Sequence, residues 1–77
     1  MAKFSNAALA ANIRVSRARS DMTQGALATA IGVNVGTIVQ YENGSMIPGS
    51  DKIFAIAEAT GCTPNDLLGW RNARKAG

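Results

Sequence analysis

Glycines that can end helices recur along this 77-residue chain, and they divide it into short segments. Gly32, Gly44 and Gly61 each follow a helix-compatible stretch, at the position of a left-handed C-terminal cap. Residue types that cap helix N-termini stand at the corresponding starts, which are Ser5, Thr23, Asn34, Ser50 or Asp51, and Thr63. This punctuation predicts five short helices, at residues 5–19, 23–31, 34–43, 50–60 and 63–69.

Apolar residues inside these segments recur with the period of a helix, and no segment alternates with the period of a strand. The positions that we expect to face inward are Leu9, Ile13, Ala26, Leu27, Ala30, Ile31, Ile53, Ile56, Ala57, Thr60, Leu67 and Leu68. A chain of this length builds one modest core. We therefore predict a single all-α domain over residues 1–69, followed at 70–77 by a basic tail or the start of a linker.

The composition argues against several classes of function. Histidine is absent, Cys62 is the only cysteine, and the five carboxylates are scattered without paired spacing. We expect no enzyme, no metal, no cofactor and no small-molecule substrate, because no nucleophile–base pair and no ligand set is visible. No apolar run is long enough for a membrane span or a signal peptide, which predicts a cytoplasmic protein. A net charge of +3 is compatible with a polyanionic partner and does not by itself identify one.

The most informative stretch runs from Thr23 to Ser45 and reads TQGALATAIGVNVGTIVQYENGS. Its two helical segments are joined through Gly32, with no room for a longer connection. Two short helices joined in this way pack at a steep angle, which is the helix-turn-helix arrangement. The second helix of such a pair projects from its domain and can enter a major groove of DNA.

The wider pattern extends this motif on both sides. It consists of Arg17, Thr23, Gln24, Leu27, Ala28, Ile31, Gly32, Val33, Thr37, Ile38, Tyr41, Glu42, Asn43, Gly44, Ile56, Ala57, Gly61, Leu67 and Leu68. Over roughly residues 9–69 the chain resembles the Cro/cI-type helix-turn-helix domain of phage repressors and related bacterial regulators. The resemblance implies a compact five-helix, repressor-like fold. It also implies sequence-specific binding of double-stranded DNA by a transcriptional regulator. Among such regulators we favour a phage-type repressor, only because repressors are common in this family.

The segment 34–43 has two faces. If Ile38 points into the core with Tyr41 and Glu42, the stripe at 35, 36, 39, 40 and 43 points outward. This stripe offers an amide that can bind an adenine edge and two valines suited to thymine methyl groups. A glycine on it permits close approach of another surface. The resemblance places base reading on this stripe, and the residues that would read are Val35, Gly36, Val39 and Gln40.

Other residues are expected to hold the DNA backbone or the recognition helix. Free N–H groups at helix N-termini attract anions. The resemblance implies backbone contacts by Gln24 and Asn43, to which we add Asn34, Thr37 and Ser45. It further implies a buried ion pair between Arg17 and Glu42, joining the first and third helices.

One departure from the family pattern matters: no Lys or Arg stands between Val33 and Ser50. Non-specific affinity for DNA comes mostly from neutralised phosphates. Here the cations would have to be Lys3, Arg14, Arg19, Lys52 or those of the tail. A second hypothesis is therefore a protein-interaction module of the same fold, with the two valines buried against a partner.

Several assignments stay open at this stage. Gln40 can be a solvated amide, Gln24 a plain first-turn residue, and the Arg17–Glu42 pair two exposed ions. Cys62 reads as a small core residue, and Trp70 as either a core cap or a dimer contact. Regulators of this kind commonly bind palindromic operators as homodimers, with half-site centres about 10 base pairs or a multiple apart. The chain can also be a fragment whose oligomerisation domain lies beyond residue 77.

Overall fold

The structure is a computed structural model, and it describes residues 5–69. This part of the chain folds into five α-helices, and it contains no strand. The helices are α1 (Asn6–Arg19), α2 (Gln24–Ile31), α3 (Val35–Asn43), α4 (Ser50–Thr60) and α5 (Pro64–Leu68). The predicted all-α, five-helix class is confirmed. The predictions for Lys3, for Trp70 and for the basic tail concern residues outside the described range, as does the predicted domain boundary at 69/70.

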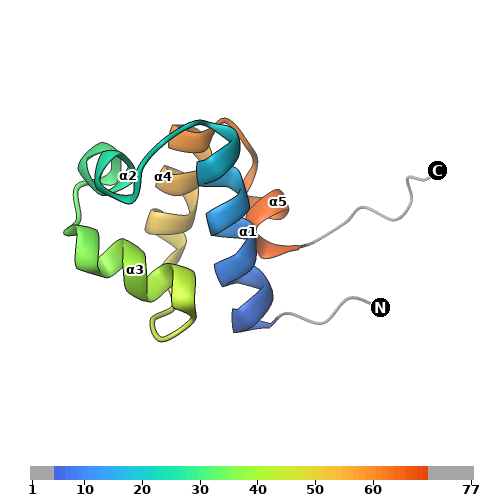
Figure 1. The fold of residues 1–77 in the computed structure, drawn as a ribbon. Helices are drawn as coiled ribbons and strands as arrows, with labels where there is room; N and C mark the ends of the chain where they lie inside the picture. The colour runs from blue at the N-terminus through green and yellow to red at the C-terminus, as the bar shows by residue number, and fades with distance from the viewer. Residues whose placement is uncertain (1–4, 70–77) are drawn as a thin grey trace.

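The helices pack around α1, which contacts α3, α4 and α5. The helix-turn-helix pair, α2 and α3, lies on one side of α1 and the short α5 on the other (Figure 1). The fourth helix contacts α2, α1 and α5, and so links the two sides. None of the helices within residues 5–69 combines the length and the apolar character needed to span a membrane.

One core joins all five helices. Its large, fully buried side chains are Leu9, Ile13, Leu27, Ile38, Ile56 and Leu67. Two of the expected inward positions are wrong, because Ala26 and Ala30 are exposed. The short α2 buries Leu27, Ala28 and Ile31. Residues 26 and 30 lie one step around the helix from this stripe, on the side that turns toward solvent.

The helix ends follow the predicted punctuation with one exception. Gly32, Gly44 and Gly61 end their helices in the left-handed conformation. The hydroxyl groups of the caps at positions 5, 23 and 63 accept hydrogen bonds from first-turn amides. The expected cap at Ser50 or Asp51 is wrong, because Ser50 is already the first residue of α4 and the N-cap is Gly49. The Gly49 carbonyl accepts the first helical hydrogen bond, from the Ile53 amide at 2.9 Å.

A glycine-to-alanine substitution should have opposite effects on stability at two positions. Gly32 has φ +76°, so Gly32→Ala places a Cβ in the left-handed region and should destabilise the domain by about 1–2 kcal/mol. Gly36 lies in α3, and a Cβ there meets no atom within 4 Å. Gly36→Ala should therefore stabilise by up to about 1 kcal/mol, because alanine favours the helix. Urea unfolding of both variants tests this, and effects of the same sign would contradict the assignment.

Tyr41, on the inner face of α3, is the only tyrosine of the chain. Burial, and secondarily the negative charge of Asp51, raises the pKa of its phenol above the ordinary 10.0. On raising the pH, the phenol therefore ionises first in the unfolded chain. The stability that the neutral phenol contributes is fully present below pH 10.0 and is lost as the pH rises toward the pKa of the folded state. We expect the phenolate absorbance of the native protein to titrate above that of the same protein in urea. Coincident titrations would refute this assignment.

Candidate nucleic-acid interface

The turn between α2 and α3 sets how the third helix projects. Gly32 ends α2 in the left-handed conformation, and Val35 is already the first residue of α3. Within the turn, the Val33 amide donates to the Ala28 carbonyl at 2.9 Å. The two helices contact one another directly. The arrangement is that of a helix-turn-helix.

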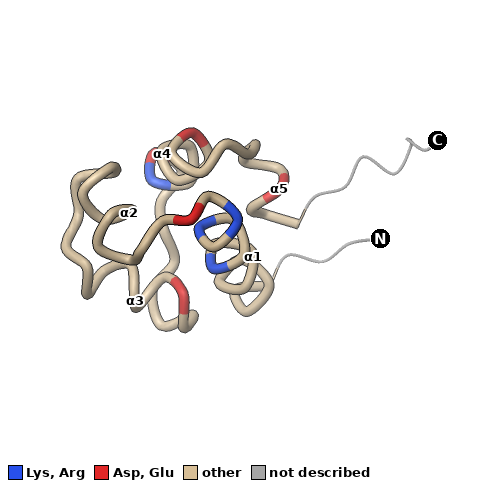
Figure 2. Tube along the Cα trace, turned by 45° about the horizontal axis from the view of Figure 1, so that its top comes forward, with Lys and Arg blue, Asp and Glu red and all other residues tan. Residues whose placement is uncertain are grey.

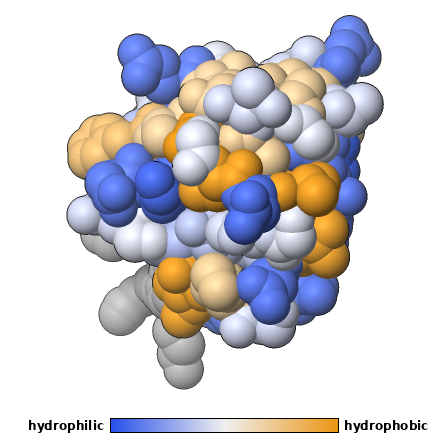
Figure 3. Space-filling view, turned by 90° about the vertical axis from the view of Figure 1, so that its left-hand side faces the viewer, coloured by the Kyte–Doolittle hydropathy of each residue, from blue (hydrophilic) through white to orange (hydrophobic). Residues whose placement is uncertain are grey.

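The two faces of α3 differ in burial as the sequence predicts. Ile38, Tyr41 and Glu42 are buried. On the opposite face, 50% of Val35 and 41% of Val39 is exposed to solvent. Gly36 and Gln40 are exposed as well. Figure 3 looks onto the side of the molecule formed by α2 and α3, where hydrophobic patches lie between polar side chains.

The helix-turn-helix surface carries almost no charge. Figure 2 shows Lys and Arg on α1 and α4, whereas the only charged residue within α2 and α3 is Glu42. Over residues 5–69 four Lys and Arg stand against five Asp and Glu, a formal net charge of −1. The positive net charge of the whole chain therefore comes from Lys3, Arg71, Arg74 and Lys75.

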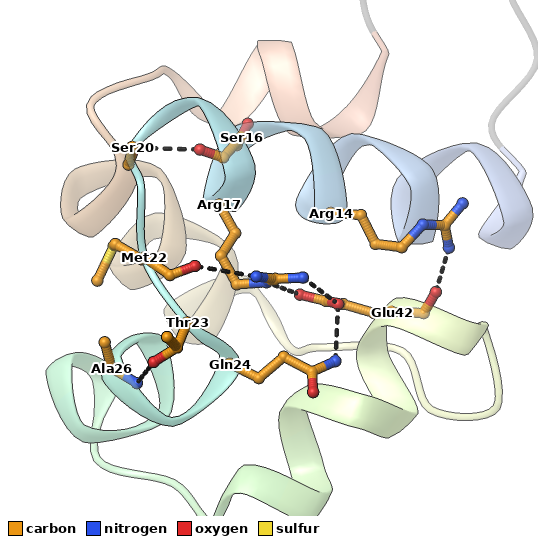
Figure 4. Close-up of polar contacts among 9 residues, drawn as sticks. All are labelled: Arg14, Ser16, Arg17, Ser20, Met22, Thr23, Gln24, Ala26 and Glu42. Atoms are coloured by element: carbon orange, nitrogen blue, oxygen red, sulfur yellow. Dashed lines mark hydrogen bonds and ion pairs between the residues drawn. The ribbon is translucent and has the colours of Figure 1, made fainter.

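A polar network centred on Glu42 joins α1, α2 and α3 (Figure 4). The Glu42 carboxylate accepts from Arg17 Nε at 2.6 Å and from Arg17 Nη2 at 3.1 Å. It also accepts from Gln24 Nε2 at 3.0 Å. The remaining Arg17 donor, Nη1, reaches the Met22 carbonyl at 2.9 Å, just before α2. The side chain of Glu42 is 5% exposed and that of Arg17 is 20% exposed.

The network fixes the position of Arg17 and favours the charged form of its guanidinium. The hydrogen bond to Glu42 raises the pKa of the Arg17 guanidinium further above its ordinary value, although burial opposes the shift. An arginine guanidinium is a cation at every accessible pH, and here its charge faces a buried carboxylate. It forms two parallel hydrogen bonds to one carboxylate, a geometry that combines strength with fixed orientation. The rotation of α3 about its own axis is consequently tied to α1.

Side chains of α1 also hold the C-terminal ends of two helices, which the sequence reasoning missed. Arg14 Nη1 donates to the Glu42 carbonyl, and Asn6 Nδ2 donates to the Gly44 carbonyl. Asn12 Nδ2 donates to the Leu67 carbonyl at 2.9 Å, near the end of α5. These bonds satisfy carbonyls that have no partner within their own helix. Arg14 therefore has a structural contact, whereas the sequence marked it only as a cation for DNA.

The residues expected to contact the DNA backbone differ in their exposure and in their hydrogen bonds. The Gln24 amide points toward Glu42 within the protein. Asn43 and Ser45 lie together, because Asn43 Oδ1 accepts from the Ser45 amide at 2.9 Å and from Ser45 Oγ at 2.5 Å. Asn34 is the N-cap of α3 but forms no capping hydrogen bond through its side chain, and it is exposed. Thr37 is half-buried.

A polar cavity lies away from this face, between α1, the end of α4 and the start of α5. Cys62 lines it and is half-buried, with its Sγ 3.5 Å from Ser16 Oγ and from Thr60 Oγ1. Among the described residues no group of three or more His, Cys, Asp or Glu could hold a metal ion. The thiol thus lies against two hydroxyl groups beside the core, not on the outward face of α3.

Comparison with known proteins identifies the class. The helix-turn-helix family matches residues 13–67. The clp gene regulator ClgR from Corynebacterium glutamicum superimposes with a TM-score of 0.79 at 29% identity, over 84% of this chain and 69% of that chain. The P22 c2 repressor, solved with a synthetic operator, gives 0.76 at 28% identity, over 82% and 96%.

A further similar structure is the SOS-response transcriptional repressor LexA from Eubacterium rectale. Its TM-score is 0.76 at 30% identity, over 82% of this chain and 67% of that chain. A search among curated proteins finds no match. Because the family match spans most of the chain, this protein belongs to the helix-turn-helix family of the Cro/cI type.

The Glu42 network makes a specific prediction about stability. Arg17→Ala leaves a buried carboxylate without its cation, and we expect a loss of about 3–5 kcal/mol. That is a large part of the roughly 4–12 kcal/mol typical of a domain this size. Arg19→Ala, which removes an exposed arginine from the last turn of the same helix, is the control and should stay within about 0.5 kcal/mol. Equal melting temperatures of the two variants would show that the ion pair contributes nothing to stability.

Proposed function

We propose that this protein binds double-stranded DNA sequence-specifically and regulates transcription, with α3 in the major groove. The observation that carries the proposal is the difference between the two faces of α3. Its inner face is fixed by the core and by the Glu42 network, whereas Val35, Gly36, Val39 and Gln40 lie exposed on the outer face. An α-helix with its side chains fits the major groove, where the base pairs can be distinguished. The P22 c2 repressor, which has this fold, was solved with an operator.

The contacts to the DNA backbone would come from the two ends of the helix-turn-helix. Gln24 donates one amide hydrogen to Glu42. Its second amide hydrogen is left for a phosphate oxygen, so the DNA contact would extend the internal network. Asn34 lies exposed at the start of α3, and Asn43 with Ser45 at its end. We assign phosphate contacts to these residues and to Thr37, which fix the position of the helix without reading sequence.

We further propose that the protein is a cytoplasmic repressor of the phage type that binds a palindromic operator as a homodimer. No Lys or Arg lies between residues 20 and 51, a range that includes both helices of the motif, so the helix-turn-helix itself neutralises few phosphates. Two linked half-sites would compensate, because the second domain binds at a high effective concentration. Half-site centres would then be about 10 base pairs apart or a multiple of that. We assign it neither an enzymatic reaction nor a cofactor.

A second candidate function is favoured by one observation. Two half-exposed valines on a neutral helix face would also suit a protein partner, so a protein-interaction module of the same fold is the alternative. The two candidates differ in their response to salt. Binding to DNA weakens as salt rises. The logarithm of the association constant falls with the logarithm of the salt concentration, with a slope of about −0.9 per neutralised phosphate. Docking through valines depends little on ionic strength, because it buries apolar surface.

The test is selection from a random-sequence duplex pool, followed by affinity measurements over a salt series. We expect a two-fold-symmetric site to be enriched. Gln40→Ala should weaken binding to that site about 5- to 150-fold, the range for loss of one bidentate base contact. Cys62→Ala, which changes a residue away from α3, should leave the affinity unchanged. No enrichment at low salt would refute DNA binding and favour the protein-interaction module.

A further inference from the structure

The outward face of α3 has an unusual chemistry for a base-reading surface. No Lys or Arg occurs between residues 20 and 51, a range that includes both helices of the motif. Guanine is read most often by the fork of Arg or Lys, and cytosine by an acidic acceptor. The only carboxylate on α3 is that of Glu42, which is buried and bound by Arg17 and Gln24. This face thus lacks the common side chains for reading G·C pairs.

The groups that the face does offer are complementary to A·T pairs. The Gln40 side chain is exposed and can form the paired hydrogen bonds to N6 and N7 of adenine. Val35 and Val39 are exposed by 50% and 41%, and apolar side chains contact the 5-methyl group of thymine. Thymine is the only base that carries a methyl group on its edge in the major groove. An apolar pair on the reading face therefore selects for them.

The spacing and the depth of these groups fit adjacent base pairs. Val35 and Val39 are one helical turn apart, so their Cβ atoms lie about 5–6 Å from each other. Successive bases of one strand rise by about 3.4 Å. The two valines would thus meet thymines one or two base steps apart. Valine is short, and the bare backbone of Gly36, with open space around its Cα, lets the helix approach the base edges closely.

We propose that the centre of each half-site is made of A·T pairs, read through thymine methyl groups at Val35 and Val39 and through adenine at Gln40. The proposal rests on the DNA-binding function proposed above and names the sequence class that this face selects. It also separates two contributions to binding. Affinity as a whole depends on salt, whereas the share due to methyl groups does not, because burial of a methyl group involves no counterion.

The experiment uses the full chain and the duplex that the random pool yields. Each thymine of the site is replaced in turn by deoxyuridine, which removes only the 5-methyl group. We expect at least two adjacent or next-adjacent positions at which binding weakens about fourfold, the fold-change for one buried methyl-sized group. The loss should be the same at low and at high salt.

Variants then assign the methyl groups to side chains. In Val39→Ala and in Val35→Ala, the preference for thymine over deoxyuridine should disappear at one position each. Val15→Ala is the matched control, because Val15 is a valine of similar exposure, 48%, on α1. It should bind as the unchanged protein does and retain both preferences. All three positions are exposed, so the fold should survive each change, which a melting curve verifies.

The outcomes distinguish the two levels of the argument. A selected site with G·C pairs at its centre, or one that tolerates deoxyuridine everywhere, would overturn the A·T inference and leave DNA binding intact. Loss of methyl preference in Val15→Ala as well would also overturn it, because the effect would then not arise on α3. A pool that yields no sequence would overturn both the inference and the proposed function.

Discussion

A buried carboxylate is the constraint on which the rest of this small fold depends. Removing an ion from water costs several kcal/mol, and the cost is recovered only when the hydrogen-bonding geometry is good. The Glu42 side chain obtains its three donors from Arg17 on α1 and Gln24 on α2, two helices other than its own. The carboxylate is therefore satisfied only when α1, α2 and α3 are correctly placed together. A local slip of α3 would leave the ion buried and unpaired.

The residues that hold α3 in place are different from those on its outward face. The core contributes Ile38 and Tyr41, the network contributes Glu42, and Arg14 and Asn6 of α1 bind carbonyls at the end of α3. None of these contacts uses the outward stripe. Side chains on that stripe can consequently change without loss of the fold, and a glycine at position 36 is tolerated for the same reason. The stripe that we propose to read DNA therefore carries none of the contacts that hold α3 in place.

Much of this structure follows from local sequence signals, and the rest depends on contacts between distant residues. The five helices, the glycine ends and the two faces of α3 could be predicted because caps and apolar spacing act within a few residues. The carbonyl contacts of Arg14 and Asn6 span 28 and 38 residues, and no local pattern indicates which carbonyl is near. Ala26 is exposed for a similar reason, since the packing partners of α2 decide which side it buries. The DNA contacts themselves remain predictions.

A neutral reading surface has a consequence for a regulator that must find one site among many. Non-specific affinity comes from neutralised phosphates and competes over the whole genome, whereas base contacts act only at the correct site. Removing cations from the recognition face weakens both kinds of binding but leaves the difference between them to the base contacts. Such a protein would bind its operator less tightly than a basic relative and would lose fewer copies to random DNA. In the proposed mode of binding, short apolar contacts and one amide would provide the selectivity, and a second half-site would restore the affinity.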